Sequence, residues 1–210
     1  MFKFALNACE VQNSADWCLA KTSNTTETKQ FLYNPDCGSG STIYIIDTGC
    51  NVNHEEFEGR DIKTIKNFVN HEPEYDKNGH GTAVASLAGG NVCGVAKQAK
   101  LRCVKVLDKD GRGSQSNIIS AIQLCAKKEN KGIINLSLGG DFSQIVNNAA
   151  NGAVKNGHLL VAAAGNDNID VARVSPASAK NVTAVAATNR KNMKSAFSNY
   201  GKAVDLFAPG

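Results

Sequence analysis

Apolar residues along this chain gather in short runs that are nearly continuous rather than alternating with polar ones. The runs cover residues 42–47, 101–107, 133–138, 159–164 and 182–187. Such runs are typical of strands that are buried on both faces of a parallel sheet. Between them lie segments whose apolar positions recur every three or four residues, as in amphipathic helices. The pattern predicts a three-layer α/β domain with a mostly parallel sheet and right-handed crossovers.

Two of the predicted helices have recognisable ends. Ser143 can cap one of them, and Asn156-Gly157 supplies a left-handed terminator after its last turn. Ser116 can cap the other, whose apolar stripe runs to Ala126. Residues 1–40 are polar and rich in turn residues, so we expect the core of the domain to lie in residues 41–210.

Length and composition limit what the chain can be. With 210 residues and 42% hydrophobic content it can bury one sizeable core. Its formal charge of +4 is spread without a basic stripe, which argues against nucleic acid as a partner. The longest apolar stretch, Leu159 to Gly165, is shorter than the roughly 18 residues of a membrane span, so none is expected.

Seven cysteines are many for a protein of a reducing compartment, and none of them has the spacing of a zinc site. A secreted, lysosome-like or vacuolar location is therefore favoured, although residues 1–7 meet polar positions before a signal-peptide core is complete. Cys103 and Cys125 fall in segments predicted to be buried, where a disulfide and a small buried thiol fit equally well. The pattern assigns no connectivity.

The candidate chemistry is concentrated at the ends of predicted elements. Asp47 closes the first apolar run, and His80 follows within an Asn-Gly-His-Gly-Thr segment. An acid that holds an imidazole in one tautomer is what the base of a serine protease requires. Taken alone, Asp47 also fits a strand-end acid, and His80 fits the start of a tightly packed helix. No serine stands in a Gly-x-Ser-x-Gly motif, so the pair indicates a chemistry without its nucleophile.

A resemblance to a known family rests on three motifs and on the segments between them. The motifs, which are similar to those of the subtilases, are Ile45-Ile46-Asp47-Thr48-Gly49, Asn78-Gly79-His80-Gly81-Thr82 and Ala162-Ala163-Ala164-Gly165-Asn166. Further segments resemble the proteinase K branch, in order and nearly without gaps: residues 54–60, 94–96, 104–108, 136–140, 175–178 and 196–201. The resemblance covers roughly residues 14 to 210 and implies a subtilisin-like fold that is incomplete at its C-terminus. Residues 1–13 fit a propeptide remnant, a vector remnant or a wrongly assigned start.

The resemblance implies a serine endopeptidase that hydrolyses peptide bonds through an acyl-enzyme. Asp47 would orient His80, His80 would act as general base and then acid, and Asn166 would donate its side-chain amide to the oxyanion. Without the resemblance, Asn166 fits an ordinary turn residue. The chain would end before its serine, so residues 1–210 alone are expected to be inactive. The alternative is a non-catalytic binding protein of the same fold.

Polypeptide substrates are the expected partners, and they would lie extended in a cleft between two backbone segments. The residues implied are Gly111, Arg112 and Gly113 on one side, Ser137, Leu138 and Gly139 on the other, and Ala162, Ala163, Ala164 and Gly165 around a primary pocket without an acid at its floor. Residues 111–113 also fit an ordinary surface turn. An inhibitory propeptide is a second expected partner.

Catalysis needs no cofactor in this scheme, but the resemblance implies a structural calcium site. Its ligands would be the backbone carbonyls of Lys180 and Val182 and the carboxylate of Asp205, because hard oxygen donors suit calcium. Asp205 also fits a residue that merely ends a strand. Asn24, within Asn24-Thr25-Thr26, is the glycan acceptor expected of a secreted form.

Overall fold

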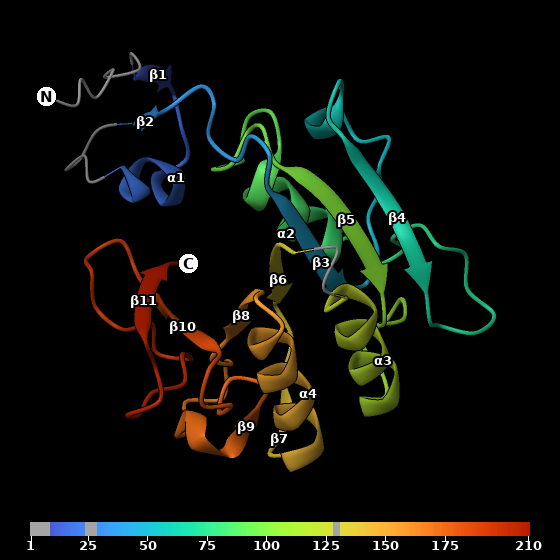
Figure 1. Cartoon of the computed structure of the whole chain (residues 1–210). Coiled ribbons are helices and arrows are strands. Elements are labelled where there is room, and N and C mark those ends of the chain that lie inside the picture. Colours follow the sequence, from blue (N-terminus) through green and yellow to red (C-terminus); the bar gives the residue numbers. More distant parts are fainter. Residues whose placement is uncertain (1–8, 24–28, 128–130) are drawn as a thin grey trace, which may run out of the picture.

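The computed structural model describes residues 9–23, 29–127 and 131–210, so Asn24 and its sequon lie outside the described residues. Its centre is a seven-stranded parallel sheet with the strand order β11-β10-β8-β6-β3-β5-β4 (Figure 1). The strands are β3 (Thr42–Asp47), β4 (Ile62–Asn67), β5 (Lys100–Lys105), β6 (Ile133–Leu136), β8 (Leu159–Ala163), β10 (Thr183–Thr188) and β11 (Leu206–Pro209). The predicted α/β architecture is confirmed.

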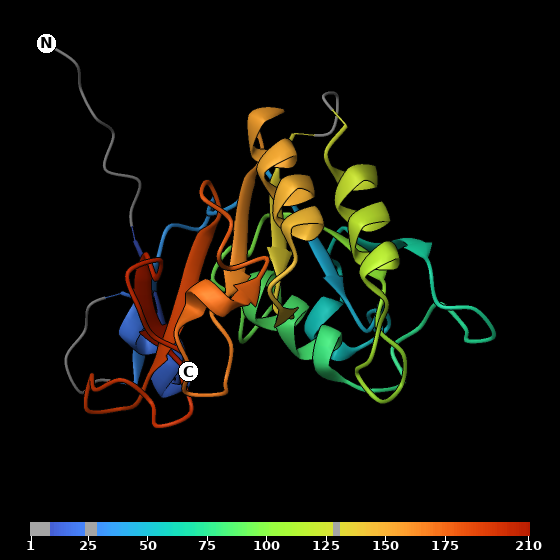
Figure 2. The ribbon, with the colours of Figure 1, turned by 90° about the horizontal axis from the view of Figure 1, so that it is seen from below.

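Helices cover both faces of this sheet (Figure 2). The helices are α2 (His80–Gly89), α3 (Gln115–Cys125) and α4 (Gln144–Lys155). Helices α3 and α4 pack beside each other on one face, and α2 lies on the other. The two layers follow from the alternation of side chains along β3. Tyr44 and Ile46 belong to the core with α3 and α4, whereas Ile43 and Ile45 belong to the core with α2.

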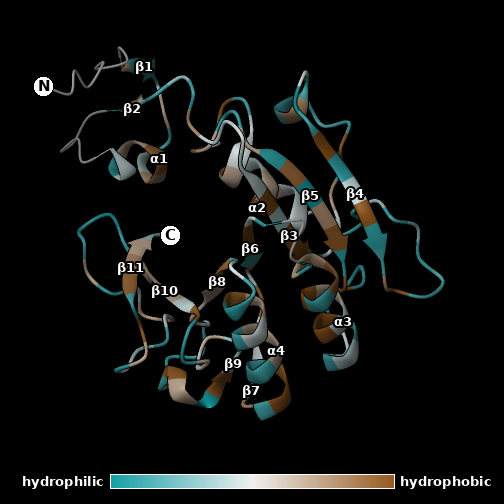
Figure 3. Cartoon of the chain, in the orientation of Figure 1, coloured by the Kyte–Doolittle hydropathy of each residue, from teal (hydrophilic) through white to brown (hydrophobic). Residues whose placement is uncertain are grey.

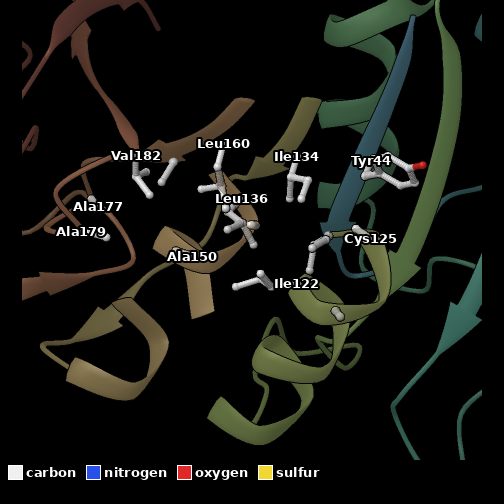
Figure 4. Packing of buried hydrophobic residues seen from close by; sticks show 14 of the residues in the cluster. Tyr44, Ile122, Cys125, Ile134, Leu136, Ala150, Leu160, Ala177, Ala179 and Val182 are labelled. Carbon is white, nitrogen blue, oxygen red and sulfur yellow. The ribbon is translucent and has the colours of Figure 1, made fainter. Parts of the chain in front are cut away.

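The larger core lies between the sheet and helices α3 and α4 (Figure 4). Ile134, Leu136 and Leu160 are 0% exposed and cluster with Ile122 of α3 and Ala150 of α4. Fully burying such a side chain contributes about 1.5–3 kcal/mol. Hydrophobic and hydrophilic positions alternate along α3 and α4 (Figure 3), as expected for helices with one buried side. None of the described helices is long and apolar enough to cross a membrane.

The helix ends confirm one predicted cap and correct the other. Ser143 caps α4 by accepting a backbone N–H of its first turn, and Gly157 follows the last turn with φ +93°. Helix α3 is capped by Ser114, whose hydroxyl accepts the Asn117 N–H at 3.2 Å. The predicted cap, Ser116, lies inside that helix, with its hydroxyl 2.9 Å from that of Ser114. Serines at both positions satisfy the same local pattern, so the pattern could not choose between them.

Several short elements surround the central sheet. They are β1 (Glu10–Asn13), α1 (Trp17–Thr22), β2 (Gln30–Tyr33), η1 (Glu55–Phe57), β7 (Gly140–Asp141), η3 (Val171–Arg173) and β9 (Val174–Ser175). Strands β1 and β2 pair antiparallel, and next to them Leu19, Ala20 and Phe31 form a small separate core. The sequence pattern predicted none of these elements, because so few residues do not establish a period.

Among the described residues, two cysteines form a disulfide and the others are thiols. Cys50, in the loop after β3, is bonded to Cys103 of β5, and both residues are buried. Of the two alternatives for Cys103, the disulfide is therefore the one adopted. Cys125 remains a thiol in the larger core, and burial raises its pKa to about 12.

One part of the sheet presents apolar side chains to solvent on the face that carries α2. Helix α2 packs there against β3 and β5. Farther along the same face, Leu159 is 52% exposed and Leu206 is 45% exposed, and Val161 and Val185 are partly buried. The strand register places these four residues on the side of Ile43. We call this surface, over β8, β10 and β11, the open face.

The two faces of β8 predict very different costs for truncating neighbouring leucines. Leu160→Ala is expected to lower the free energy of unfolding by about 2–5 kcal/mol, because it leaves a cavity in the larger core. The matched control, Leu159→Ala, truncates an exposed side chain and should cost about 0.5 kcal/mol or less. Urea unfolding of the chain and both variants measures the difference. Equal losses would contradict the assignment of the two side chains to opposite faces.

Candidate active site

Two side chains meet at the carboxyl end of the sheet. Asp47 is the last residue of β3 and is 0% exposed, and His80 is the first residue of α2. Nδ1 of His80 lies 2.7 Å from Oδ1 of Asp47, and the His80 side chain is 49% exposed. The same Oδ1 accepts the Thr48 N–H at 2.7 Å. Because an ionised carboxylate only accepts, the proton of neutral His80 lies on Nδ1 and its Nε2 can act as a base.

Glycine at position 81 is needed for the approach of α2 to the end of β3. A Cβ at Gly81 would collide with the carbonyl oxygen of Gly49. At the start of the helix, Gly79 has φ +99°, a conformation that residues with a Cβ rarely adopt. The glycines that flank His80 in its motif therefore have a steric role.

Asp76 holds the segment that carries His80, and the sequence analysis did not single it out. Its Oδ1 accepts from the Thr48 hydroxyl at 2.8 Å and from the Gly79 N–H at 2.9 Å. Its Oδ2 accepts from the Thr82 N–H at 2.9 Å and the Thr82 hydroxyl at 2.7 Å. Burial alone would raise the pKa of Asp76, but the hydrogen bonds outweigh burial and lower it. Asp76 lies three residues before Gly79, the N-cap of α2, so a capping pattern would not have identified it.

Lys105 is a buried cation next to the end of β3, and the sequence patterns did not identify it either. It pairs in register with Asp47 and is 0% exposed. Its Nζ donates to the carbonyl oxygens of Thr48 at 2.8 Å and Leu107 at 2.7 Å, and lies 3.2 Å from Oε2 of Glu72. No sequence pattern indicates this role, because an isolated lysine in an apolar strand usually turns its amine to solvent.

The surroundings of His80 set its protonation. The hydrogen bond to Asp47 raises its pKa above the ordinary value of 6.5, and the charges of Asp47 and Asp76 add to this, while burial opposes it. A raised pKa means that the protonated ring stabilises the fold most below pH 6.5. That contribution is lost as pH rises through the folded-state pKa. His80 is therefore available as a base only above that pKa.

A cleft of two adjoining hollows runs past His80. The first hollow has a volume of ≈ 460 Å³, and residues 111–113 line it together with His80. The second hollow has a volume of ≈ 480 Å³, and Asn166 lines it. Residues 137–139 line both hollows. The two segments expected to flank a peptide thus line the first hollow together with His80.

The small residues at the end of β8 and directly after it divide between the cleft and the core. Ala163 and Gly165 line the second hollow. Ala162 and Ala164 are 1% exposed and belong to the larger core, because side chains alternate between the faces of a strand. Of the four residues expected around the pocket, only Ala163 and Gly165 therefore line the hollow. The hollow also has three charged residues in its lining that were not anticipated: Asp141, Asp167 and Arg173.

Asn166 lies on a turn that a buried asparagine holds in place. Asn199 is 0% exposed, and its Nδ2 donates to the Ala164 carbonyl at 2.8 Å. Its Oδ1 accepts the N–H groups of Asp167 and Ile169, each at 3.0 Å. Asn166 itself is exposed at the edge of the second hollow. The turn is fixed while the Asn166 amide remains accessible to a ligand.

The residues expected to bind calcium lie near the start of β10. Asp205 donates its N–H to the Ala184 carbonyl at 3.0 Å, and its Oδ2 accepts the Ala184 N–H at 2.8 Å. Val182 precedes Ala184 by two residues, and Lys180 precedes Val182 by two. The described residues hold no group of three His, Cys, Asp or Glu side chains placed to bind a metal. A metal here would therefore depend on backbone oxygens besides the one carboxylate.

The serines near the end of the chain have structural partners. Ser195 is 5% exposed and Ser198 is 0% exposed. The Ser198 hydroxyl donates to the Asn199 carbonyl at 3.1 Å and accepts the Ala187 N–H at 3.0 Å. Over residues 9–23, 29–127 and 131–210, no hydroxyl or thiol hydrogen-bonds to Nε2 of His80. The pair can accept a proton from a hydroxyl only if one is brought to that nitrogen.

Comparisons of the sequence with family models and with curated proteins all match the same protein family. The family model described as "Subtilase family" matches residues 38–210. "Subtilisin-like protease 2" of Pseudogymnoascus destructans is 42% identical over 99% of this chain and 52% of its own length. "Subtilisin-like protease 7" of Trichophyton tonsurans is 43% identical over 98% of this chain and 53% of its own. The chain thus spans about half the length of the curated relatives it matches.

A solved structure gives the same result for the fold. The crystal structure of a cold adapted subtilisin-like serine proteinase superposes with a TM-score of 0.88 and 40% sequence identity. The match covers 94% of this chain and 73% of that chain.

The contact with Asp47 predicts the titration of His80. We expect NMR to give a His80 pKa above 6.5 in the chain, and a lower value in Asp47→Asn, which removes the charge and the main cause of the shift. Asp110→Asn is the control, because that exposed acid pairs with Lys109 instead. A His80 pKa that Asp47→Asn leaves unchanged would overturn the electrostatic role given to Asp47.

Proposed function

The chain belongs to the subtilase family, and from this membership we propose that the whole protein is a serine endopeptidase that acts through an acyl-enzyme. The observation that carries the proposal is the 2.7 Å contact between Asp47 and His80. It lies beside a hollow of ≈ 460 Å³, within the range of ligand sites. A protein that only bound peptides would have no use for an imidazole held by a buried acid.

In this mechanism His80 moves protons and Asp47 does not. Nε2 of His80 takes the proton of the serine hydroxyl as its oxygen attacks the scissile carbonyl carbon. The same proton passes to the amine as the C–N bond breaks, leaving an acyl-enzyme. Water then attacks the ester carbonyl carbon while His80 takes a proton from it, and His80 returns that proton to the serine oxygen as the ester C–O bond breaks and the acid product leaves. Asp47 stays ionised and stabilises the imidazolium that forms each time.

We propose that the serine lies outside residues 1–210, on a helix that packs against the open face. The open face presents Leu159 and Leu206 to solvent, which an amphipathic helix would cover. It adjoins the second hollow, since Ala163 lies on the same side of the sheet. A helix there could present its first residue to Nε2 of His80, within the roughly 2.6–3.2 Å that proton transfer requires.

The cleft supplies the other parts of the reaction. Asn166 would donate its amide to the oxyanion, and the turn that Asn199 holds favours this because the donor needs no rearrangement. Removing one such donor typically costs about 10²–10³ in kcat. Residues 111–113 and 137–139 would pair with the backbone of an extended substrate, so a polypeptide is the proposed substrate.

Location and regulation follow from the same membership. We propose that the protein works in an oxidising compartment, outside the cell or in a vacuole, because it carries the Cys50–Cys103 disulfide. An inhibitory propeptide is the proposed regulatory partner, since a peptide in the groove would block access to His80.

We further propose a structural calcium ion at Asp205, with the carbonyls of Lys180 and Val182. The fit is supported by the bond from Ala184 N–H to Oδ2, which brings the carboxylate to the segment that holds the carbonyls. Oδ1 of Asp205 accepts no hydrogen bond from the described residues and is left for a ligand. When bound, the ion would tie β10 to the segment before β11.

Probe labelling tests the proposed function. We expect the whole protein to react with a fluorophosphonate, which captures activated serines, and His80→Ala to abolish the reaction because nothing then accepts the serine proton. Residues 1–210 alone should not react. No labelling and no peptide hydrolysis by the whole, folded protein would instead support the binding-protein alternative.

Calcium is expected to raise the melting temperature of the protein, because it binds only the folded state. At about 100 times its dissociation constant the ion adds about 2.7 kcal/mol, or roughly 5–10 °C. Asp205→Asn keeps an acceptor for the Ala184 N–H but loses the charge, so it should lose the calcium response. Melting points that do not depend on calcium in either protein would show that the site does not exist.

A further inference from the structure

The first hollow has one permanent charge in its lining. Its other lining residues, apart from His80, are neutral: Thr48, Asn78, Leu107, Gly111, Gly113, Ile118, Ser137, Leu138 and Gly139. Arg112 is exposed and lines the hollow as well. A peptide side chain that enters the hollow therefore meets a guanidinium.

That guanidinium has no ion-pair partner among the described residues. Two acids lie close to Arg112 along the chain, and one of them, Asp108, uses Oδ1 to accept the backbone N–H groups of Asp110 and Arg112, each at 2.9 Å. These bonds, first the one from Arg112, lower the pKa of Asp108. Asp110 pairs with Lys109 at 2.9 Å. The charge of Arg112 is thus available to a ligand.

The loop that carries Arg112 is tight. Asp108 N–H donates to the Arg112 carbonyl at 2.8 Å, and Gly111 N–H donates to the Asp108 carbonyl at 3.0 Å. Gly111 has φ +75°, and a Cβ at Gly113 would collide with the carbonyl oxygen of Val106. The backbone position of Arg112 is therefore set before a peptide arrives, which reduces the entropy lost on binding.

We infer that Arg112 gives the cleft a preference for peptides with an acidic side chain in the first hollow. This inference rests on the proposed function, whose substrate it specifies. A guanidinium binds a carboxylate through two parallel N–H···O bonds, which a neutral amide does not match. Because Arg112 is exposed, the preference is modest and depends on salt.

The second hollow does not share this preference. It is lined by two acids, Asp141 and Asp167, and by Arg173, so its formal charge has the opposite sign. A carboxylate there would meet acids on part of the wall. The selection for an acidic residue is thus confined to the part of the peptide that lies beside residues 111–113.

The test compares Glu with Gln in fluorogenic peptides, at each position from four residues before the scissile bond to two after it. For the whole protein we expect kcat/KM to be about three to ten times higher with Glu at one position in low salt. At about 0.5 M NaCl the ratio should fall below about two, since screening weakens exposed pairs. Arg112→Gln should remove the preference, and Arg112→Lys should keep part of it.

Lys109→Gln is the matched control. It removes the same charge from the same loop, but Lys109 pairs with Asp110 and does not line the hollow, so the Glu to Gln ratio should stay as in the unaltered protein. A Glu to Gln ratio near one at every position, or a preference that survives in Arg112→Gln, overturns the inference. In both cases the hydrolysis of the peptides still supports the proposed function.

If the whole protein cleaves no peptide, the proposed function fails and binding decides the inference. Fluorescence anisotropy would then compare labelled Glu and Gln peptides on the same protein. Tighter binding of the Glu peptide that Arg112→Gln removes supports the role of Arg112. Equal binding of both peptides overturns it.

Discussion

The bond between Asp47 and His80 requires a carboxylate that is removed from water, and much of the surrounding structure compensates for that burial. An unpaired buried charge costs several kcal/mol. Oδ1 of Asp47 has two partners, the Thr48 N–H and His80. Oδ2 accepts no hydrogen bond from the described residues, which leaves a desolvation cost of about 1–3 kcal/mol. The fold therefore has to hold this carboxylate in place by other contacts.

Thr48 is where those contacts converge, since each of its polar groups has a partner. Its N–H donates to Asp47, its hydroxyl donates to Asp76 and accepts the Gly81 N–H, and its carbonyl accepts from Lys105. The strand end, the first turn of α2 and the end of β5 are thus joined through one residue. His80 cannot shift relative to Asp47 without breaking several of these bonds at once.

The sequence predicted the features that depend on periodicity and on family motifs. It did not predict features that depend on contacts between residues distant in the chain. The apolar runs at β3 and β8 are nearly continuous, so they do not show which side chains share a face of the sheet. The family resemblance therefore placed Ala162 and Ala164 in the cleft, although both lie in the larger core. The Cys50–Cys103 bond joins a loop to a strand that only the fold brings together. Lys105 has a carbonyl partner across the sheet, in Thr48, which a local pattern cannot reveal.

Chemistry and recognition depend on different parts of this molecule. Asp47 and His80 are fixed by a strand end, a helix start and buried partners, so substitutions there are expected to disturb the fold as well as the proposed reaction. Arg112 stands on a loop whose shape is set by backbone bonds to Asp108 and by glycines, and its side chain forms no ion pair with the described residues. The charge at this position can therefore change without moving the Asp47–His80 pair. If the proposed function holds, such a division would let one catalytic framework acquire different peptide preferences through single exposed residues of the cleft.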